Sequence, residues 1–179
     1  MLKYSCSAYA EGNGMKAKNY REVKGQAYTR KKYMKGSQQP KITKFTMGDT
    51  SKKFEYKALL IAQKKVQVRH NALEAARVAA NRVLSEKLGN DYLLNIMPYP
   101  HVILRENKMI FGAHADRLQD GMRKAFGKSI GTAARVRVNQ PVIIADVNEN
   151  GIEAAKEALK RGGAKLPTPC RIIIEETSD

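Results

Sequence analysis

Short runs of hydrophobic residues, separated by polar and glycine-rich stretches, divide the chain beyond about residue 40 into strands and helices. The run YKALLIAQKKVQVRH (residues 56–70) is typical of strand structure with a polar interruption at residues 63–65. We predict two strands around the Pro98-Tyr99-Pro100 turn, two within AARVRVNQPVIIADV (residues 133–147) and one at CRIIIEE (residues 170–176). Because the first half of residues 133–147 alternates arginine and valine, we expect it to bury only one face. The pattern predicts about six strands.

Two segments have the periodicity of amphipathic helices. The first, residues 71–89, begins with Asn71 and Glu74 at the spacing of a capping box and ends in glycine. The second, residues 150–162, has Glu153 at the same distance from its first residue and also ends in glycine. The residues predicted to face the core are Leu73, Ala76, Ala80, Val83 and Leu84 in the first helix, and Ile152, Ala155 and Leu159 in the second.

The order of these elements predicts the fold class. Strands in pairs between single helices do not suggest a doubly wound parallel sheet, so we predict an α+β fold, a mixed or antiparallel β-sheet sandwich with two helices. Residues 1–40 lack both apolar periodicities and are predicted to form an extended basic arm, and residues 41–179 a single α+β domain. Within that domain, residues 112–132 contain four glycines and are predicted to form a long loop that reaches outward.

Charge indicates the chemistry of the partner. The chain has 33 Lys and Arg against 17 Asp and Glu, a formal net charge of +16. A soluble enzyme rarely carries such an excess without a polyanionic partner, so nucleic acid or an anionic surface is expected. Residues 121–140 hold five cations and no acid, whereas the chain after residue 140 is slightly acidic. We therefore expect one end of the molecule to face the polyanion.

Two stretches combine cations with groups suited to RNA. In AYTRKKYMKG (residues 27–36), cations could neutralise phosphates while tyrosines stack on bases or sugars, and the alternative is a solvated tail. We expect the arm to be ordered mainly by what it binds. The polar face of the first helix presents Arg77 and Arg82, with Arg69 and His70 just before it. Cations or helix N–H groups could bind phosphate there, with ordinary solvated charges as the alternative.

Other function classes lack their signals. No apolar run approaches the length of a membrane span, and the first residues lack the apolar core of a signal peptide, so we expect a cytoplasmic protein without a membrane partner. Cys6 and Cys170 stand far apart and the three histidines are scattered. We therefore expect two reduced thiols, no metal site and no cofactor.

Two enzyme hypotheses were weighed against RNA binding. Gly127-Lys128-Ser129 matches the end of a nucleotide-binding P-loop, but the pattern requires glycine where Met122 stands. An RNA-modifying enzyme would need a grouped acid, base or nucleophile, and neither the cysteines nor the histidines fall in such a group. We expect no enzymatic activity.

Five segments carry a family resemblance. They are KNYREVKGQAYTRKKYMKG, VQVRHNALEAARVAANRVL, PHVILRENKM, GAHADRLQDGMRKAFGKSIGTAARV and TPCRIIIEE. In this order they closely resemble segments of the archaeal and eukaryotic large-subunit ribosomal protein family L-ten-e, which is shared with bacterial ribosomal protein L-sixteen. The first fifteen residues, His114 and a short C-terminus depart from the family pattern.

The resemblance implies a structural constituent of the large ribosomal subunit. Such a protein is embedded in ribosomal RNA between the central protuberance and the stalk base, near the elbow and acceptor arm of aminoacyl-site tRNA. Its internal loop would point toward the peptidyl-transferase centre, supporting tRNA positioning and subunit maturation. The implied partners are the large-subunit ribosomal RNAs, the tRNA acceptor region, neighbouring ribosomal proteins and assembly factors.

Two sets of site residues are predicted. The ribosomal RNA-binding residues are Arg21, Tyr28, Arg30, Lys31, Lys32, Arg69, His70, Arg77, Arg82, Arg105 and Arg135. The loop residues facing tRNA and the peptidyl-transferase centre are Asp116, Arg117, Gln119, Gly121, Met122, Arg123, Lys124, Phe126, Gly127 and Lys128. The loop glycines, Gly131 among them, are expected to allow close approach of RNA.

Overall fold

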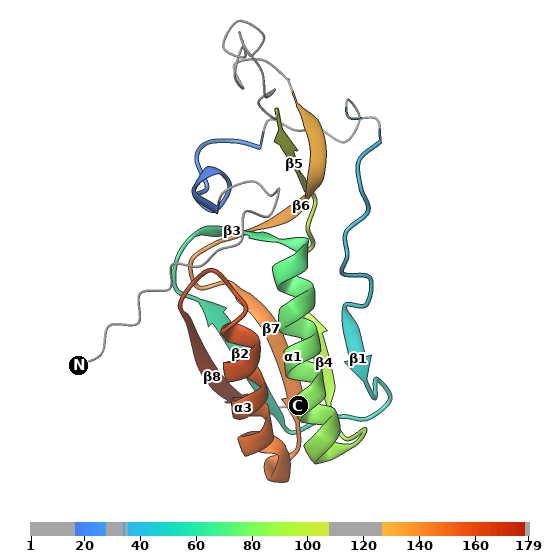
Figure 1. The fold of residues 1–179 in the computed structure, drawn as a ribbon. Helices are drawn as coiled ribbons and strands as arrows, with labels where there is room; N and C mark the ends of the chain where they lie inside the picture. Colours follow the sequence, from blue (N-terminus) through green and yellow to red (C-terminus); the bar gives the residue numbers. More distant parts are fainter. Residues whose placement is uncertain (1–16, 28–33, 35, 108–126, 178–179) are drawn as a thin grey trace, which may run out of the picture.

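The computed structural model describes residues 17–27, 34, 36–107 and 127–177 (Figure 1). These residues form two α-helices and eight β-strands. The strands make up two sheets, and every strand pairing is antiparallel. This confirms the predicted α+β class. The predictions for Tyr28 to Lys32 and for residues 108–126 lie outside the described residues.

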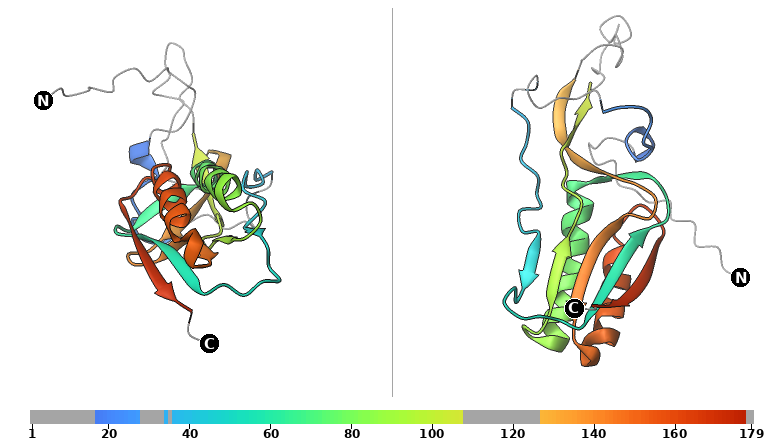
Figure 2. Two further views of the ribbon diagram at one scale, coloured as in Figure 1. Left: turned by 90° about the horizontal axis from the view of Figure 1, so that it is seen from below. Right: turned by 180° about the vertical axis from the view of Figure 1, so that it is seen from behind.

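The larger sheet has five strands in the order β1-β4-β7-β2-β8. Their bounds are β1 Thr46–Gly48, β2 Tyr56–Ala62, β4 Leu93–Ile96, β7 Pro141–Val147 and β8 Cys170–Glu176. Helices α1 (His70–Leu88) and α3 (Ile152–Gly163) lie side by side on one face of this sheet, as the views from front and behind agree (Figure 1, Figure 2). A short 3-10 turn, η3 (Glu149–Gly151), precedes α3.

The core lies between the helices and this sheet. All five predicted core residues of the first helix are buried, as are Ala155 and Leu159, whereas Ile152 is half-buried. The helices approach closely through small residues: a Cβ at Gly162 would lie 3.3 Å from the Ala76 carbonyl oxygen and 3.4 Å from Ala80 Cβ. Glycine at position 162 therefore permits the contact that joins the helices.

The smaller sheet has three strands in the order β3-β6-β5 and lies at the other end of the molecule (Figure 1). Its strands are β3 Val66–Arg69, β5 Val102–Glu106 and β6 Lys128–Val136. The predicted loop at residues 112–132 is wrong at its C-terminal end, because residues from Lys128 onward belong to β6. Pairing with β5, in which Lys128 lies opposite Glu106, overrides the glycine-rich composition.

Both predicted capping boxes are wrong. Helix α1 begins at His70, with the extended residue Arg69 before it and no side-chain cap, because β3 runs directly into the helix. Helix α3 begins at Ile152, after η3, again without a side-chain cap. The first predicted C-terminus is correct: Gly89, at φ 62°, follows the last residue of α1.

Two strand predictions need correction. Strand β1 was not predicted, because its three residues have no alternating pattern and form a strand only by pairing with β4. The expected one-sided burial of the alternating residues 135–138 is wrong at its end: Val136 is buried and Arg137 exposed, but Val138 is 53% exposed in the turn after β6.

Candidate nucleic-acid interface

Residues 20–25 of the N-terminal arm, which we call the docked arm, lie against β3. The Gln67 backbone N–H donates to the Arg21 carbonyl over 2.8 Å, and Gln67 Nε2 donates to the Tyr20 carbonyl over 3.1 Å. Gln67 is itself buried, so these bonds satisfy a polar side chain that would otherwise destabilise the fold. The body therefore places this part of the arm, contrary to the expectation that a partner orders all of it.

Two arginines of the three-stranded sheet also contact the docked arm. Arg135 Nη1 donates to the Gly25 carbonyl over 2.9 Å, and the Arg69 guanidinium lies 5.4 Å from the centre of the Tyr20 ring, in cation–π contact. Neither arginine forms an ion pair with an acid among the described residues, and the Nε of each is buried without a hydrogen-bond partner. Their positive charge is therefore not neutralised within the described part of the protein.

A second group of cations, the cationic turns, lies on two connections between the sheets and at the adjoining start of β8. Its exposed members are Lys64 and Lys65 between β2 and β3, Arg137 after β6, and Arg171 in β8. Hydrogen bonds hold these connections together: Asn139 N–H donates to the Ala62 carbonyl over 2.9 Å, and Arg171 Nη2 donates to Asn139 Oδ1 over 3.3 Å. The topology thus gathers cations that are more than a hundred residues apart in the sequence.

The cationic turns are not among the RNA-binding residues predicted from the sequence. The Lys64-Lys65 pair and Arg137 are visible in the sequence as charges between predicted strands. Their common location depends on the pairing of β2 with both β7 and β8, which the hydrophobic pattern does not reveal.

The predicted RNA-binding loop joins β5 to β6. Arg105 lies opposite Ser129, and Lys128 lies opposite Glu106, so both predicted cations stand at the base of this hairpin. Gly127 has φ 104°, and a Cβ there would lie 2.8 Å from the Glu106 carbonyl carbon. Glycine is thus required where the chain enters β6. Since a strand and no helix follows the Gly-Lys-Ser tripeptide, the P-loop geometry is absent here.

The two arginines predicted to bind RNA on the first helix, Arg77 and Arg82, each bind a carboxylate of the same helix. Arg77 binds both carboxylate oxygens of Glu74, at 2.9 and 2.5 Å, and its Nη1 lies 3.0 Å from Met47 Sδ of β1. The hydrogen bonds with Arg77 lower the pKa of Glu74 and raise that of Arg77. Arg82 is exposed and pairs with Glu86 at 2.8 Å. Both guanidinium groups are therefore matched by a neighbouring carboxylate.

His70, predicted to bind RNA, is buried at the start of α1. Its Nδ1 accepts a hydrogen bond of 2.8 Å from the Lys41 backbone N–H, so the ring proton of neutral His70 is on Nε2. A Cβ at Gly131 of β6 would lie 2.9 Å from that Nε2. The space at Gly131, which we expected to admit RNA, is thus occupied by the imidazole. Burial, with Arg69 and Lys41 nearby, lowers the pKa of His70 below its ordinary value of 6.5.

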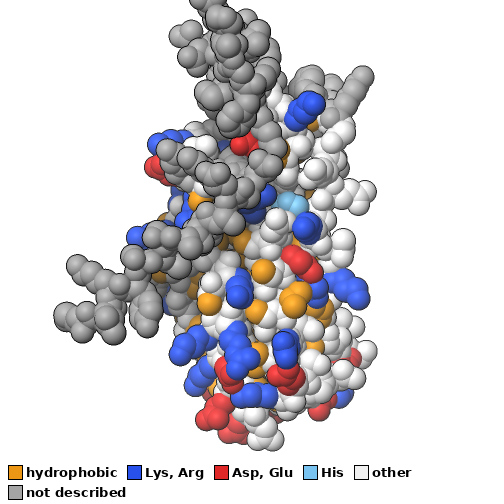
Figure 3. Space-filling view, in the orientation of Figure 1, with side chains coloured by type: hydrophobic (Ala, Val, Ile, Leu, Met, Phe, Trp, Pro, Cys, Tyr) orange, Lys and Arg blue, Asp and Glu red, His pale blue; other side chains and the backbone are white. Residues whose placement is uncertain are grey.

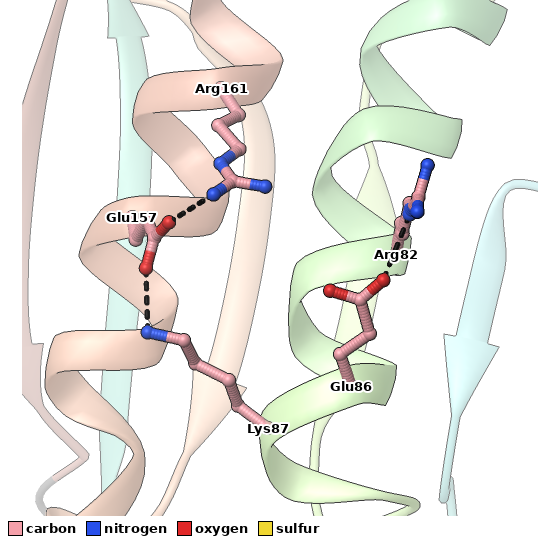
Figure 4. A network of polar contacts seen from close by, with 5 residues as sticks. All are labelled: Arg82, Glu86, Lys87, Glu157 and Arg161. Atoms are coloured by element: carbon pink, nitrogen blue, oxygen red, sulfur yellow. Dashed lines mark hydrogen bonds and ion pairs between the residues drawn. The ribbon is translucent and has the colours of Figure 1, made fainter.

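At the opposite end of the molecule, cations are paired with acids. Glu157 of α3 binds Lys87 of α1 at 2.6 Å and Arg161 at 2.5 Å, which joins the two helices (Figure 4). Lys52 binds Asp91 at 2.5 Å. Acidic side chains gather over the lower ends of the helices in Figure 3, and the charge of Glu176 raises the pKa of Tyr56 nearby. Lys87, Arg161 and Lys52 are thus paired with acids, as is Lys24 with Glu22 in the docked arm at 3.0 Å, whereas Arg69 and Arg135 are paired with no described acid.

The described part of the chain contains no candidate metal site and no helix that could span a membrane. No group of three or more His, Cys, Asp or Glu side chains there could hold a metal ion. None of the described helices is long and apolar enough to cross a membrane. Cys170 is a free thiol whose pKa is raised by burial, and Cys6 lies outside the described residues.

Comparisons with known proteins agree on one family. The family described as ribosomal protein L16p/L10e matches residues 23–173. The large ribosomal subunit protein uL16 of Picrophilus torridus is 47% identical over 163 residues, covering 90% of this chain and 93% of that protein. The uL16 proteins of Staphylothermus marinus and Methanococcus maripaludis strain C7 are 52% and 46% identical, over 89% and 91% of this chain and 92% and 95% of theirs.

Proposed function

This chain belongs to the ribosomal protein L16p/L10e family of non-enzymatic large-subunit constituents, and we propose that it binds ribosomal RNA through the docked arm, the cationic turns and the base of the β5–β6 hairpin. These three features lie at or next to the three-stranded sheet. RNA folded around a protein presents phosphates in many directions, which suits dispersed cations better than a concave catalytic pocket.

The uneven pairing of charges carries this proposal. Lys87, Arg161 and Lys52 are matched by acids, as is Lys24 in the docked arm, whereas Arg69 and Arg135 of the three-stranded sheet form no ion pair among the described residues. Cations without an acidic partner attract phosphate without first breaking an ion pair. The polyanion is therefore expected at the end of the three-stranded sheet.

The predicted residues have different roles in this interface. We assign direct phosphate contacts to Arg21, Arg69, Arg105, Lys128 and Arg135, together with the cationic turns. His70 and Arg77 act as positioning residues, because one is buried against Gly131 and the other is bound to Glu74. Arg82 would reach phosphate only by releasing Glu86.

The family resemblance supports a finer placement for the loop between β5 and β6. In this proposal the loop points toward the peptidyl-transferase centre and the acceptor end of aminoacyl-site tRNA, while the body lies near the stalk base. Its cations Arg117, Arg123, Lys124 and Lys128 contact RNA backbone, and Met122 and Phe126 pack against bases. The protein then supports tRNA positioning and final subunit maturation in the cytoplasm.

A pair of double variants tests the RNA-binding end. Lys64→Glu with Lys65→Glu reverses two exposed charges of the cationic turns, and Lys156→Glu with Lys160→Glu makes the same change in net charge on α3. Binding to large-subunit ribosomal RNA is measured on filters over a series of salt concentrations. We expect the turn variant to bind at least about tenfold more weakly, with a shallower salt dependence, and the α3 variant to stay near the parent protein.

Two results would contradict this proposal. Equal losses in the two variants would show that net charge alone matters and that the cationic turns are not the interface. Undiminished binding by the turn variant would exclude its lysines from contact with RNA.

A further inference from the structure

An uncharged groove lies beside the three-stranded sheet. One wall is the extended segment at residues 36–45, which we call the strap, and the other is the chain from Tyr99 to Ile103. The groove has a volume of about 660 Å³, within the range of small-ligand sites. It is lined by Ser37, Gln38, Gln39, Pro40, Ile42, Thr43, Phe45, Tyr99, Pro100, His101, Ile103 and Thr132.

The lining favours a nucleobase over a phosphate. None of the lining residues is Lys, Arg, Asp or Glu, so an anionic group would find no fixed opposite charge inside. Tyr99 is 55% exposed and lies against Phe45, with ring centres 5.6 Å apart. This leaves an aromatic surface open for stacking. Gln38 and Gln39 add amide donors and acceptors of the kind that pair with base edges.

The floor of the groove holds an unsatisfied polar group. Thr132 of β6 is only 6% exposed, and its Oγ1 is buried without a hydrogen-bond partner. Because this oxygen has almost no accessible surface, Thr132 closes the floor of the groove and is not a hydrogen-bond partner for a bound base.

Cations flank the groove on its outer side. Lys41 and Lys44 of the strap are exposed, alternate with the lining residues Ile42, Thr43 and Phe45, and form no ion pair among the described residues. The Lys41 backbone is fixed by its hydrogen bond to His70. The strap therefore carries positive charge next in sequence to the residues that line the groove, available to the phosphates of a nucleotide whose base enters it.

We propose that this groove binds one unpaired nucleotide of ribosomal RNA, with the base stacked on Tyr99 and its phosphates contacted by Lys41 and Lys44. The site rests on the RNA binding proposed above and adds to it a specific contact with a single unstacked base. Duplex RNA is excluded, because its bases are already stacked and paired.

A fluorescent variant tests the site directly. The chain has no tryptophan, so Tyr99→Trp places a single reporter in the groove, and Tyr56→Trp places one at the acidic end as a matched control. The probes are single-stranded hexaadenylate and a duplex RNA of equal strand length. We expect hexaadenylate to quench the Tyr99→Trp emission by about half or more through stacking, and the duplex to leave it unchanged.

The outcomes separate this site from the proposed function. If RNA binds on filters but quenches both tryptophans equally, or neither, the groove is not a nucleotide site. The proposal of general RNA binding then still stands. Failure of any RNA to bind overturns both. In large subunits that contain the Tyr99→Trp variant and are washed free of tRNA, retained quenching supports a ribosomal base. Quenching that appears only after tRNA is added assigns the groove to tRNA and overturns our assignment.

Discussion

His70 is a single buried residue at the meeting point of three elements. It opens α1, accepts a hydrogen bond from the strap at Lys41 and lies against Gly131 of β6. The neutral ring fits this place, because Nδ1 must stay unprotonated to accept the Lys41 N–H. Arg69 and Lys41 would also repel a charged imidazole. The position of the strap, and of the groove beside it, therefore depends on the protonation of one side chain.

The lowered pKa of His70 predicts acid sensitivity. Above about pH 6.5 the ring is neutral in both the folded and unfolded chain, and its full stabilising contribution is present. As the pH falls from 6.5 toward the lower folded-state pKa, the unfolded chain takes up a proton first. Stability should then fall by at most about 1.4 kcal/mol per pH unit. His70→Asn retains an acceptor for Lys41 and cannot titrate, so this part of the pH dependence should disappear in urea unfolding experiments. The same pH dependence in both proteins would exclude His70 as its source.

Because Gly131 lies against His70, we predict that position 131 does not tolerate a methyl group. Gly131→Ala would bring Cβ to 2.9 Å from His70 Nε2, and should lower the free energy of unfolding by about 1–3 kcal/mol. Gly163→Ala is the matched control, because its Cβ would meet Leu60 at an ordinary 3.5 Å and alanine favours a helix by about 0.5–1 kcal/mol. Denaturant midpoints should therefore move in opposite directions, and equal midpoints would refute the contact.

At the scale of elements, the hydrophobic pattern predicted the helices, whose positions depend on burial. It missed the features that depend on neighbouring elements. The two helices follow from the spacing of residues such as Leu73 and Leu84, which are buried as expected. Their first residues do not follow, because the β3 connection and the η3 turn replace the capping boxes at Asn71 and Asn150. Strand β1 exists only through its pairing with β4, so no local signal could have revealed it.

Two ion pairs on α1 have similar chemistry and different surroundings. The side chains of Arg77 and Glu74 are 17% and 27% exposed, and Arg77 also contacts β1 through Met47. Arg77→Ala should lower the free energy of unfolding by about 2 kcal/mol, between the values for exposed and buried pairs. The side chains of Arg82 and Glu86 are 77% and 56% exposed, so Arg82→Ala should leave the free energy of unfolding nearly unchanged. Equal effects in chemical denaturation would contradict the structural role of Arg77.

The β5–β6 hairpin predicts that its loop can be exchanged without loss of the fold. Glu106 and Lys128 are paired directly, so the two chain ends at the loop are held together by the sheet. Replacing residues 108–126 by a short glycine-serine linker should change the free energy of unfolding by less than about 1 kcal/mol. Large subunits containing this variant should be defective in translation. Normal translation rates would refute the loop's role, and failure to enter subunits would make the loop an assembly anchor.

For the molecule as a whole, the sequence predicted an anionic partner but only part of the surface that we propose for it. The excess of cations before residue 140 indicated which half of the chain is basic. Lys64 and Lys65 lie near Arg171 because β2 is next to β8 in the sheet, and this order cannot be predicted by counting charges. Helical spacing pairs Arg77 with Glu74, and the strand order places Met47 of β1 beside Arg77, so cations that look equivalent in the sequence have different surroundings.

The strand order also has a consequence for how the chain is synthesised. The central strand of each sheet, β6 or β7, comes late: β6 begins at Lys128 and β7 ends at Val147. While the ribosome extends the chain, strands β1 to β5 have emerged with no central strand to pair with. Neither sheet can be completed during that interval. The basic arm is made first and is exposed to anions in the cell before β6 is made. Only β6 supplies Arg135, which binds the docked arm at Gly25. A polypeptide that ended before β6 would keep the charge of the arm and lose this anchor.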